Sequence, residues 1–295
     1  MTRLYLFIFC LSSPVSALFA QDQTVSLGLF TGITATHSWD TGMDRDARYS
    51  AMHNLRFAPI SINYSLDYEG FGFFINPGLV NIGQNFQVVN TSGGYVGKRK
   101  VHQQYLNIPL AVRLHLIDLD FFRLSLVGGG SWAFLLDGSE KIEHDATRLR
   151  FPAQVYPLLP SDYSIEYDGV ATPPVDDYTL LQKRDFRSYQ VFALLGFRAD
   201  WDVSDAWRIS ADVRVHYGIL DPRSPAYLDK LDRYEALYDL PGRRHDTYAL
   251  VGIGVSRYFS LSQHADNGRK QTKGTPKRKN GKNPWPGPRR KKPRS

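Results

Sequence analysis

Ser210, Asp212 and His216 are the residues of this sequence whose types and spacing most resemble a nucleophilic site. On an extended strand these residues share one face, where neighbours two positions apart are about 6.6 Å apart by strand rise. A catalytic triad needs its members within hydrogen-bond reach, together with donors for an oxyanion, and no such donor is evident. The pattern therefore favours a polar ladder of ion pairs over a serine hydrolase built into a strand.

Charged side chains recur on the same polar face of several other segments. Burying unpaired charges costs several kcal/mol each, so this face must be wet or lined with ion pairs. We expect a network of ion pairs, and its candidate members are Arg113, Arg123, Arg198, Asp200, Arg208, Asp212, Arg214 and His216.

Other chemistry has little support in the sequence. The one cysteine, Cys10, lies in the leader described below, so the rest of the chain has no thiol for catalysis or metal binding. The eight histidines include no i,i+4 pair and no ligand cluster, which argues against a zinc site. The glycines 128–130 lack the Lys-Ser/Thr that completes a phosphate-binding loop. We expect no metal and no cofactor.

The elements that position these residues are strands. In the stretch 100–116 the even positions from Leu106 to Leu116 are aliphatic, while the odd positions from Gln103 to His115 are mostly polar or small, a period of two that excludes a helix. Similar alternation recurs along the chain and predicts eight strands, with one bulge in the third. The segments are 24–36, 55–68, 71–82, 100–116, 121–135, 187–201, 207–217 and 247–259.

The links between these segments alternate in length. The long links are 37–54, 83–99, 136–186 and 218–246, and the short ones 69–70, 117–120 and 202–206. Short turns on one side of a membrane and long loops on the other are typical of an up-and-down outer-membrane barrel. Aromatic residues recur at segment ends, as in the girdles at the two lipid boundaries. We therefore predict an all-β fold, an eight-stranded antiparallel up-and-down transmembrane β-barrel with long outward loops.

Two of the long loops carry further expectations. The loop 136–186 is acidic and rich in proline, and its spacing fits no calcium-binding pattern. We favour a solvated outer loop over a site for a divalent cation or for a partner's basic patch. In the last loop, the stretch 227–240 is expected to add a short helix.

The ends of the chain differ from its middle. Residues 1–20 read as a signal peptide, because one cation precedes a short apolar run and the small residue Ala20 precedes the cleavage point, although Leu18 is larger than usual for its position. Residues 21–261, the predicted barrel, carry a net charge of −5, and residues 262–295 carry +11. This basic tail has too few apolar residues to fold, so we expect it to be disordered in the periplasm. It would contact anionic headgroups or periplasmic proteins there, or be an inert extension, and no nucleic-acid partner is expected.

Three motifs carry a family resemblance. They are YLNIPL at 105–110, VGGGSW at 127–132 and DVRVHYGI at 212–219. With them the chain resembles the PorT-type outer-membrane β-barrel family, small OmpA-like barrels of which some members serve a protein-secretion machine. We do not carry that secretion role over to this chain.

These observations predict an integral protein of the outer membrane of a Gram-negative-type bacterium, embedded in lipid, with a structural or interaction role and no enzymatic activity. Two alternatives remain open. One is a barrel-embedded hydrolase of lipid or lipopolysaccharide that uses Ser210 and His216. The other is a periplasmic lipocalin-like barrel that binds an apolar ligand, which requires the aliphatic rows to face inward.

Overall fold

The computed structural model describes residues 23–174 and 176–261. The signal peptide predicted at 1–20 and the basic tail predicted at 262–295 lie outside these residues. The strands are β1 (Gln23–Asp40), β2 (Tyr49–Ala51), β3 (Asn54–Asp67), β4 (Phe71–Ile75), β5 (Gly78–Ile82), β6 (Asn85–Val89), β7 (Tyr95–Leu119), β8 (Phe122–His144), β9 (Leu149–Arg150), β10 (Ser164–Tyr167), β11 (Val170–Thr172), β12 (Asp176–Leu181), β13 (Tyr189–Asp202), β14 (Trp207–Gly218) and β15 (Arg244–Leu261). The helices are α2 (Pro225–Asp232) and the 3-10 turns η1 (Met43–Arg45), η2 (Tyr156–Leu158) and η3 (Lys183–Asp185). Within the described ranges, no helix has the length and apolar character to cross a membrane.

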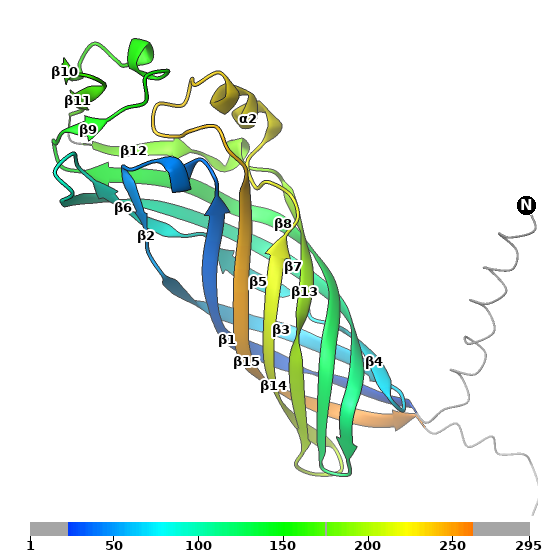
Figure 1. Ribbon diagram of the computed structural model, residues 1–295. Coiled ribbons are helices and arrows are strands. Elements are labelled where there is room, and N and C mark those ends of the chain that lie inside the picture. Colours follow the sequence, from blue (N-terminus) through cyan, green and yellow to red (C-terminus); the bar gives the residue numbers. More distant parts are fainter. Residues whose placement is uncertain (1–22, 175, 262–295) are drawn as a thin grey trace, which may run out of the picture. The chain divides into compact units, whose positions relative to one another are not determined.

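The long strands form one antiparallel sheet that closes on itself. Backbone pairing runs β8-β13-β14-β15-β1-β3-β4-β7, and β7 pairs with β8 in turn. Figure 1 shows these strands side by side, with the short turns at one end and α2 with β9–β12 at the other. The β3–β4 turn is tight because Gly70 adopts φ +82°, a conformation that glycine accepts without strain. The predicted alternation of short and long links is confirmed.

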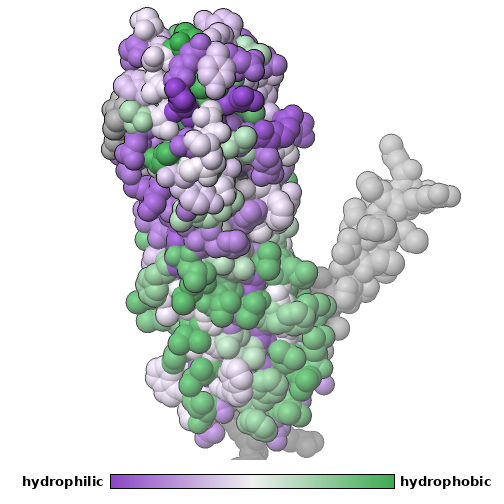
Figure 2. Space-filling model, turned by 60° about the vertical axis from the view of Figure 1, so that its left-hand side comes forward, coloured by the Kyte–Doolittle hydropathy of each residue, from purple (hydrophilic) through white to green (hydrophobic). Residues whose placement is uncertain are grey.

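The two faces of the wall have opposite polarity. Along β14, Val213 is 51% exposed while Asp212 is 1% exposed, and β7 alternates in the same way between Leu114 and Arg113. Figure 2 shows the resulting apolar band on the outer surface of one part of the barrel, with hydrophilic residues beyond it. The prediction that the aliphatic rows face outward is confirmed, and the lipocalin-like alternative, which requires them inside, is wrong.

One predicted strand and one predicted loop differ from the structure. The segment 71–82 is two strands, β4 and β5, because Asn76 and Pro77 interrupt the pairing with β7. The stretch 136–186 is not a simple loop. β8 continues to His144 and stays paired with β7, after a one-residue register shift at Gln104/Tyr105, because strand pairing does not depend on an apolar outer face once the strand has left the lipid.

The remainder of that stretch, together with α2 from the link 218–246, forms a small folded unit that we call the outer cap; it consists of β9 to β12, η2 and α2. Strands β9, β11 and β10 make a separate sheet, and β12 adds to the end of β8. Its core contains Leu149, Phe151, Val155, Ala171 and Tyr238. The short helix expected at 227–240 is α2, which starts earlier, at Pro225, because the Ser224 hydroxyl caps it by accepting from the Tyr227 N–H at 3.2 Å.

Candidate functional site

Most of the charged residues predicted to form ion pairs meet inside the barrel, near its short-turn end. Strand register places Arg198 of β13 opposite Asp212 of β14, and Asp200 opposite Ser210. Arg113 reaches the same region from β7. We call this group the inner ion-pair layer, and its members are Asp67, Arg113, Arg198, Asp200, Arg208, Asp212 and Arg214.

Asp200 is the centre of the inner layer. Its two carboxylate oxygens accept from Arg198 Nε at 2.9 Å and from Arg113 Nη1 at 3.1 Å. Asp67 then links Arg113 to Arg208, whose Nη1 donates to Asp67 Oδ2 at 3.1 Å. All of these side chains are buried. A buried charge is tolerated when it is paired and hydrogen-bonded, and this layer meets that condition over most of its length.

Sequence reasoning missed Asp67, although the signal was present. Asp67 continues the polar parity of Asn63 and Ser65 along β3, so the same alternation that selected the other members applies to it. Arg123, which was among the candidates, lies at the edge of the layer. Its side chain is 20% exposed and donates to Asp118 at 2.9 Å, with Asp67 farther away at 3.7 Å.

The structure does not bring Ser210, Asp212 and His216 together as a triad. The Ser210 hydroxyl donates to Asp200 at 2.6 Å and accepts from Arg198 at 2.8 Å, so it is part of the ion-pair layer. His216 instead stacks on Tyr248, with ring centroids 4.3 Å apart and an interplanar angle of 10°. A hydrolytic triad would need Ser210 and His216 in contact, and each of them has other neighbours.

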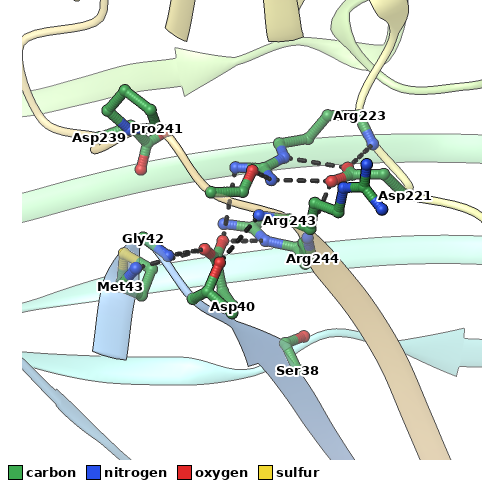
Figure 3. Close-up of polar contacts among 12 residues, drawn as sticks. Ser38, Asp40, Gly42, Met43, Asp221, Arg223, Asp239, Pro241, Arg243 and Arg244 are labelled. Atoms are coloured by element: carbon green, nitrogen blue, oxygen red, sulfur yellow. Dashed lines mark hydrogen bonds and ion pairs between the residues drawn. The ribbon is translucent and has the colours of Figure 1, made fainter. Parts of the chain in front are cut away.

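A second set of buried charges lies at the opposite end, beneath the outer cap, and was not predicted. We call it the outer ion-pair layer, and its members are Asp40, Arg99, Glu140, Asp221, Arg223, Asp239 and Arg244. Figure 3 shows Arg223 and Arg244 converging on Asp40. Arg244 Nε donates to Asp40 at 2.8 Å, while the other Asp40 oxygen accepts from the backbone N–H of Gly42 at 2.9 Å.

Glu140 connects the two sides of the outer layer. It accepts from Arg99 Nε at 2.5 Å and from Arg244 Nη1 at 2.9 Å. Arg99 also pairs with Asp239, which in turn accepts from the Tyr227 hydroxyl at 2.6 Å. The layer therefore ties the barrel strands β1, β7, β8 and β15 to the segment that carries α2.

Asp239 of the outer layer and its hydrogen-bond partner Tyr227 of α2 have shifted pKa values. Burial alone would raise the pKa of Asp239, but the guanidinium groups of Arg99, Arg244 and Arg223 outweigh it and hold that pKa below its ordinary range. Burial and the adjacent Asp239 carboxylate raise the pKa of Tyr227. Asp239 is therefore ionised and Tyr227 neutral at any physiological pH, which is the arrangement that their hydrogen bond requires.

The outer cap also contains a cleft of about 380 Å³. Aromatic rings line much of it, and one of them, Tyr178, is 55% exposed. Charged groups stand among these rings. The lining includes Tyr163, Tyr178, Tyr227, Tyr238, Lys230 and Glu235. Apolar walls with a few polar groups are typical of binding sites. Among the described residues, no group of three or more His, Cys, Asp or Glu side chains is arranged to hold a metal ion.

A closed antiparallel barrel with an apolar outer band and charged interior is the architecture of an outer-membrane protein. The sequence agrees with this class: residues 19–221 match the family model of the outer membrane protein beta-barrel domain. The chain belongs to that family, and it is a protein of the outer membrane. No curated protein matches it.

Several solved structures are similar to the chain. The N-terminal β-barrel domain of Pseudomonas aeruginosa OprF is 10% identical, covers 81% of this chain and 100% of that chain, and gives a TM-score of 0.31. OprG from the same organism is 12% identical over 81% and 96% of the two chains, with a TM-score of 0.34. Ail, the attachment invasion locus protein of Yersinia pestis, is 10% identical over 81% and 99%, with a TM-score of 0.30.

Proposed function

We propose that this protein is a non-enzymatic barrel of eight transmembrane strands, of the PorT type, whose role is structural or interactive at the cell surface. The observation that carries this proposal is the pair of buried ion-pair layers. Arg113 and Arg198 fill the barrel near one end, and Arg99 and Arg244 fill it near the other, all with 2% exposure or less. A small barrel whose interior is filled by side chains gives no wide diffusion path.

The count of eight is supported by the cycle of pairings β8-β13-β14-β15-β1-β3-β4-β7, in which β7 pairs with β8 again. The motifs at 105–110, 127–132 and 212–219 support the PorT assignment. The absence of enzymatic activity is supported by the separate environments of Ser210 and His216. An interaction role is supported by the aromatic cleft of the outer cap, because a folded cap with its own core presents a defined surface.

The partners that we propose are outer-membrane lipid around the barrel and, for the tail at 262–295, anionic headgroups or periplasmic proteins.

Conductance tests the filled interior. We expect the purified protein in a planar lipid bilayer to give no stable open-channel steps. Removing the central carboxylate of the outer layer, with Glu140→Ala, is expected to produce intermittent current, because Arg99 and Arg244 then lack their shared partner. Large, stable steps from the unaltered protein would contradict the proposal.

A photo-crosslinking experiment tests the interaction role. A benzophenone side chain at Tyr178 in the cleft is compared with one at Tyr95, which is similarly exposed but does not line the cleft. On intact cells we expect a discrete crosslinked product from Tyr178 alone. Equal products from both positions would show that the cleft has no special role.

A further inference from the structure

The barrel wall has a seam between β3 and β5. β3 pairs with β4 only over Tyr64–Asp67, and β5 pairs with β7 alone. Beyond that ladder, toward the outer cap, the Ile62 N–H donates to the Pro77 carbonyl at 3.0 Å. The next backbone hydrogen bond across the seam runs from the Met52 N–H to the Asn85 carbonyl at 2.9 Å. Among the described residues, no backbone hydrogen bond joins 54–61 of β3 to β5.

This seam lies within the apolar band. The side chains beside it are among the most exposed apolar groups of the wall: Leu55 is 76% exposed, and Ile60 is 65% exposed. An open strand edge is costly in hydrocarbon, where no water satisfies the free N–H and C=O groups. Pro59 and Pro77 reduce that cost because neither has an N–H to leave unpaired.

Side chains close the two ends of the seam. At the lower end the amide of Asn76 donates to the Ile62 carbonyl at 2.9 Å. At the upper end Arg56 reaches across from β3 and donates to the Val101 carbonyl of β7 at 3.0 Å. Between these two bridges only side-chain packing separates the lipid from the interior.

A cavity of about 30 Å³ lies directly behind the seam. Pro59 and Leu79 of the wall line it on the outer side, and Asn107, Arg214, His216 and Tyr248 line it on the inner side. Neither ring nitrogen of His216 has a hydrogen-bond partner, and Arg214 Nη1 has none, although both residues are only 1% exposed. Buried polar groups are seldom left without partners, so these atoms are available to bond a ligand that enters the cavity.

Three unpartnered groups line the cavity: Arg214 and His216 offer donors, which favour an anion, and Asn107 Oδ1 is an acceptor. Asp212 is the one carboxylate within ion-pair distance of Arg214 among the described residues, and Arg198 shares it at 3.7 Å. Arg214 is thus only partly neutralised in a site of low dielectric constant. A ring N–H of His216 faces the same cavity and can supply a second donor.

We propose that the seam is a lateral portal for a long-chain carboxylic acid taken from the lipid phase. The carboxylate enters the cavity and bonds to Arg214 and His216, while the acyl tail stays among Leu55, Ile60 and Leu79. The small cavity admits a planar carboxylate, whereas the bulky phosphate head of a two-chain phospholipid does not fit. This inference is independent of the proposed function, because binding from the side requires no path through the filled interior.

Binding of cis-parinaric acid, a fluorescent long-chain carboxylate, tests the proposal on the full chain in detergent micelles. We expect saturable binding at one site per chain, and binding of its methyl ester at least tenfold weaker. Leu79→Trp, which covers the mouth, and Arg214→Met are each expected to weaken binding of the acid at least tenfold. Leu195→Trp, a matched change on the lipid face of β13, is expected to leave it unchanged.

His216→Phe guards against misfolding, since phenylalanine preserves the stack on Tyr248 while removing both nitrogens. It is expected to weaken binding of the acid and to keep the heat-dependent gel shift of a folded barrel. Equal, non-saturating uptake of acid and ester would overturn the proposal. So would unchanged affinity in both Leu79→Trp and His216→Phe.

Discussion

Glu140→Gln is the sharpest test of the outer ion-pair layer. The substitution preserves the size of the side chain and removes only its charge. Its control is Glu143→Gln, three residues along the same strand. Glu140 is fully buried against Arg99, whereas Glu143 pairs with Lys100, with both side chains nearly half exposed.

The expected loss follows from the contacts. Glu140 accepts from Arg99 at 2.5 Å and from Arg244 at 2.9 Å. Hydrogen bonds to charged groups contribute about 1.5–3 kcal/mol each, and the amide of glutamine keeps one acceptor while turning two donors toward guanidinium groups. Breaking a buried ion pair by removing one partner costs about 3–5 kcal/mol. The exposed pair of Glu143 and Lys100 is screened by water, so its loss is expected to be undetectable.

Urea unfolding in lipid vesicles, followed by tryptophan fluorescence and by the gel shift, measures the difference. With a urea dependence of about 3 kcal/mol per molar, a loss of this size lowers the midpoint by about 1 M or more. We expect that shift in Glu140→Gln and none in Glu143→Gln. If the two variants unfold together, the buried carboxylate does not stabilise the outer layer and the reasoning fails.

Three further outcomes are expected. The pKa of Asp239 is lowered in the folded protein, so its ion pairs add stability that is complete above the unfolded pKa of about 3.9 and lost as the pH falls through the lower folded value. Unfolding of Asp239→Asn followed from pH 7 to pH 3 should therefore start from a lower stability and depend less on pH than the unaltered protein. Ser210→Ala and His216→Ala should leave the lipid and lipopolysaccharide composition of the outer membrane unchanged, as mass spectrometry would show; altered acylation would support a hydrolase. Ser224→Ala should destabilise α2 by about 1 kcal/mol, visible as faster amide hydrogen exchange confined to that helix.

The wall of the barrel could be predicted because lipid imposes a simple pattern. Where a strand crosses the bilayer, outward positions such as Leu114 and Val213 must be apolar, and inward positions such as Arg113 and Asp212 are free to be charged. That contrast has a period of two and is visible in one sequence. This contrast identified most members of the inner ion-pair layer from the sequence, and it supports the position of that layer inside the barrel.

The outer layer could not be found in the same way. Above the bilayer the outward positions of β7 and β8 face water, so residues such as Lys100 and Glu143 replace the aliphatic ones and the contrast disappears. Arg99 and Glu140 then look like residues of solvated loops. Asp239, the other partner of Arg99, is 140 residues farther along the chain, and no local pattern connects the two.

The seam shows a different limit of the pattern. Alternation reports which way a side chain faces, and β5 alternates correctly, with Val80 and Ile82 inward. It does not report whether the backbone of a strand is paired on both sides. That property depends on Asn76 and Pro77, which end β4 and displace β5 from β3 while leaving its ladder with β7 intact. Pro59 and Pro77 would be unfavourable in the sheet of a soluble protein. In the wall of a membrane barrel they make an unpaired strand edge tolerable, because they remove two N–H groups that lipid cannot satisfy. The position of prolines within alternating segments is therefore the sequence signal to examine when openings in the wall of a barrel are sought.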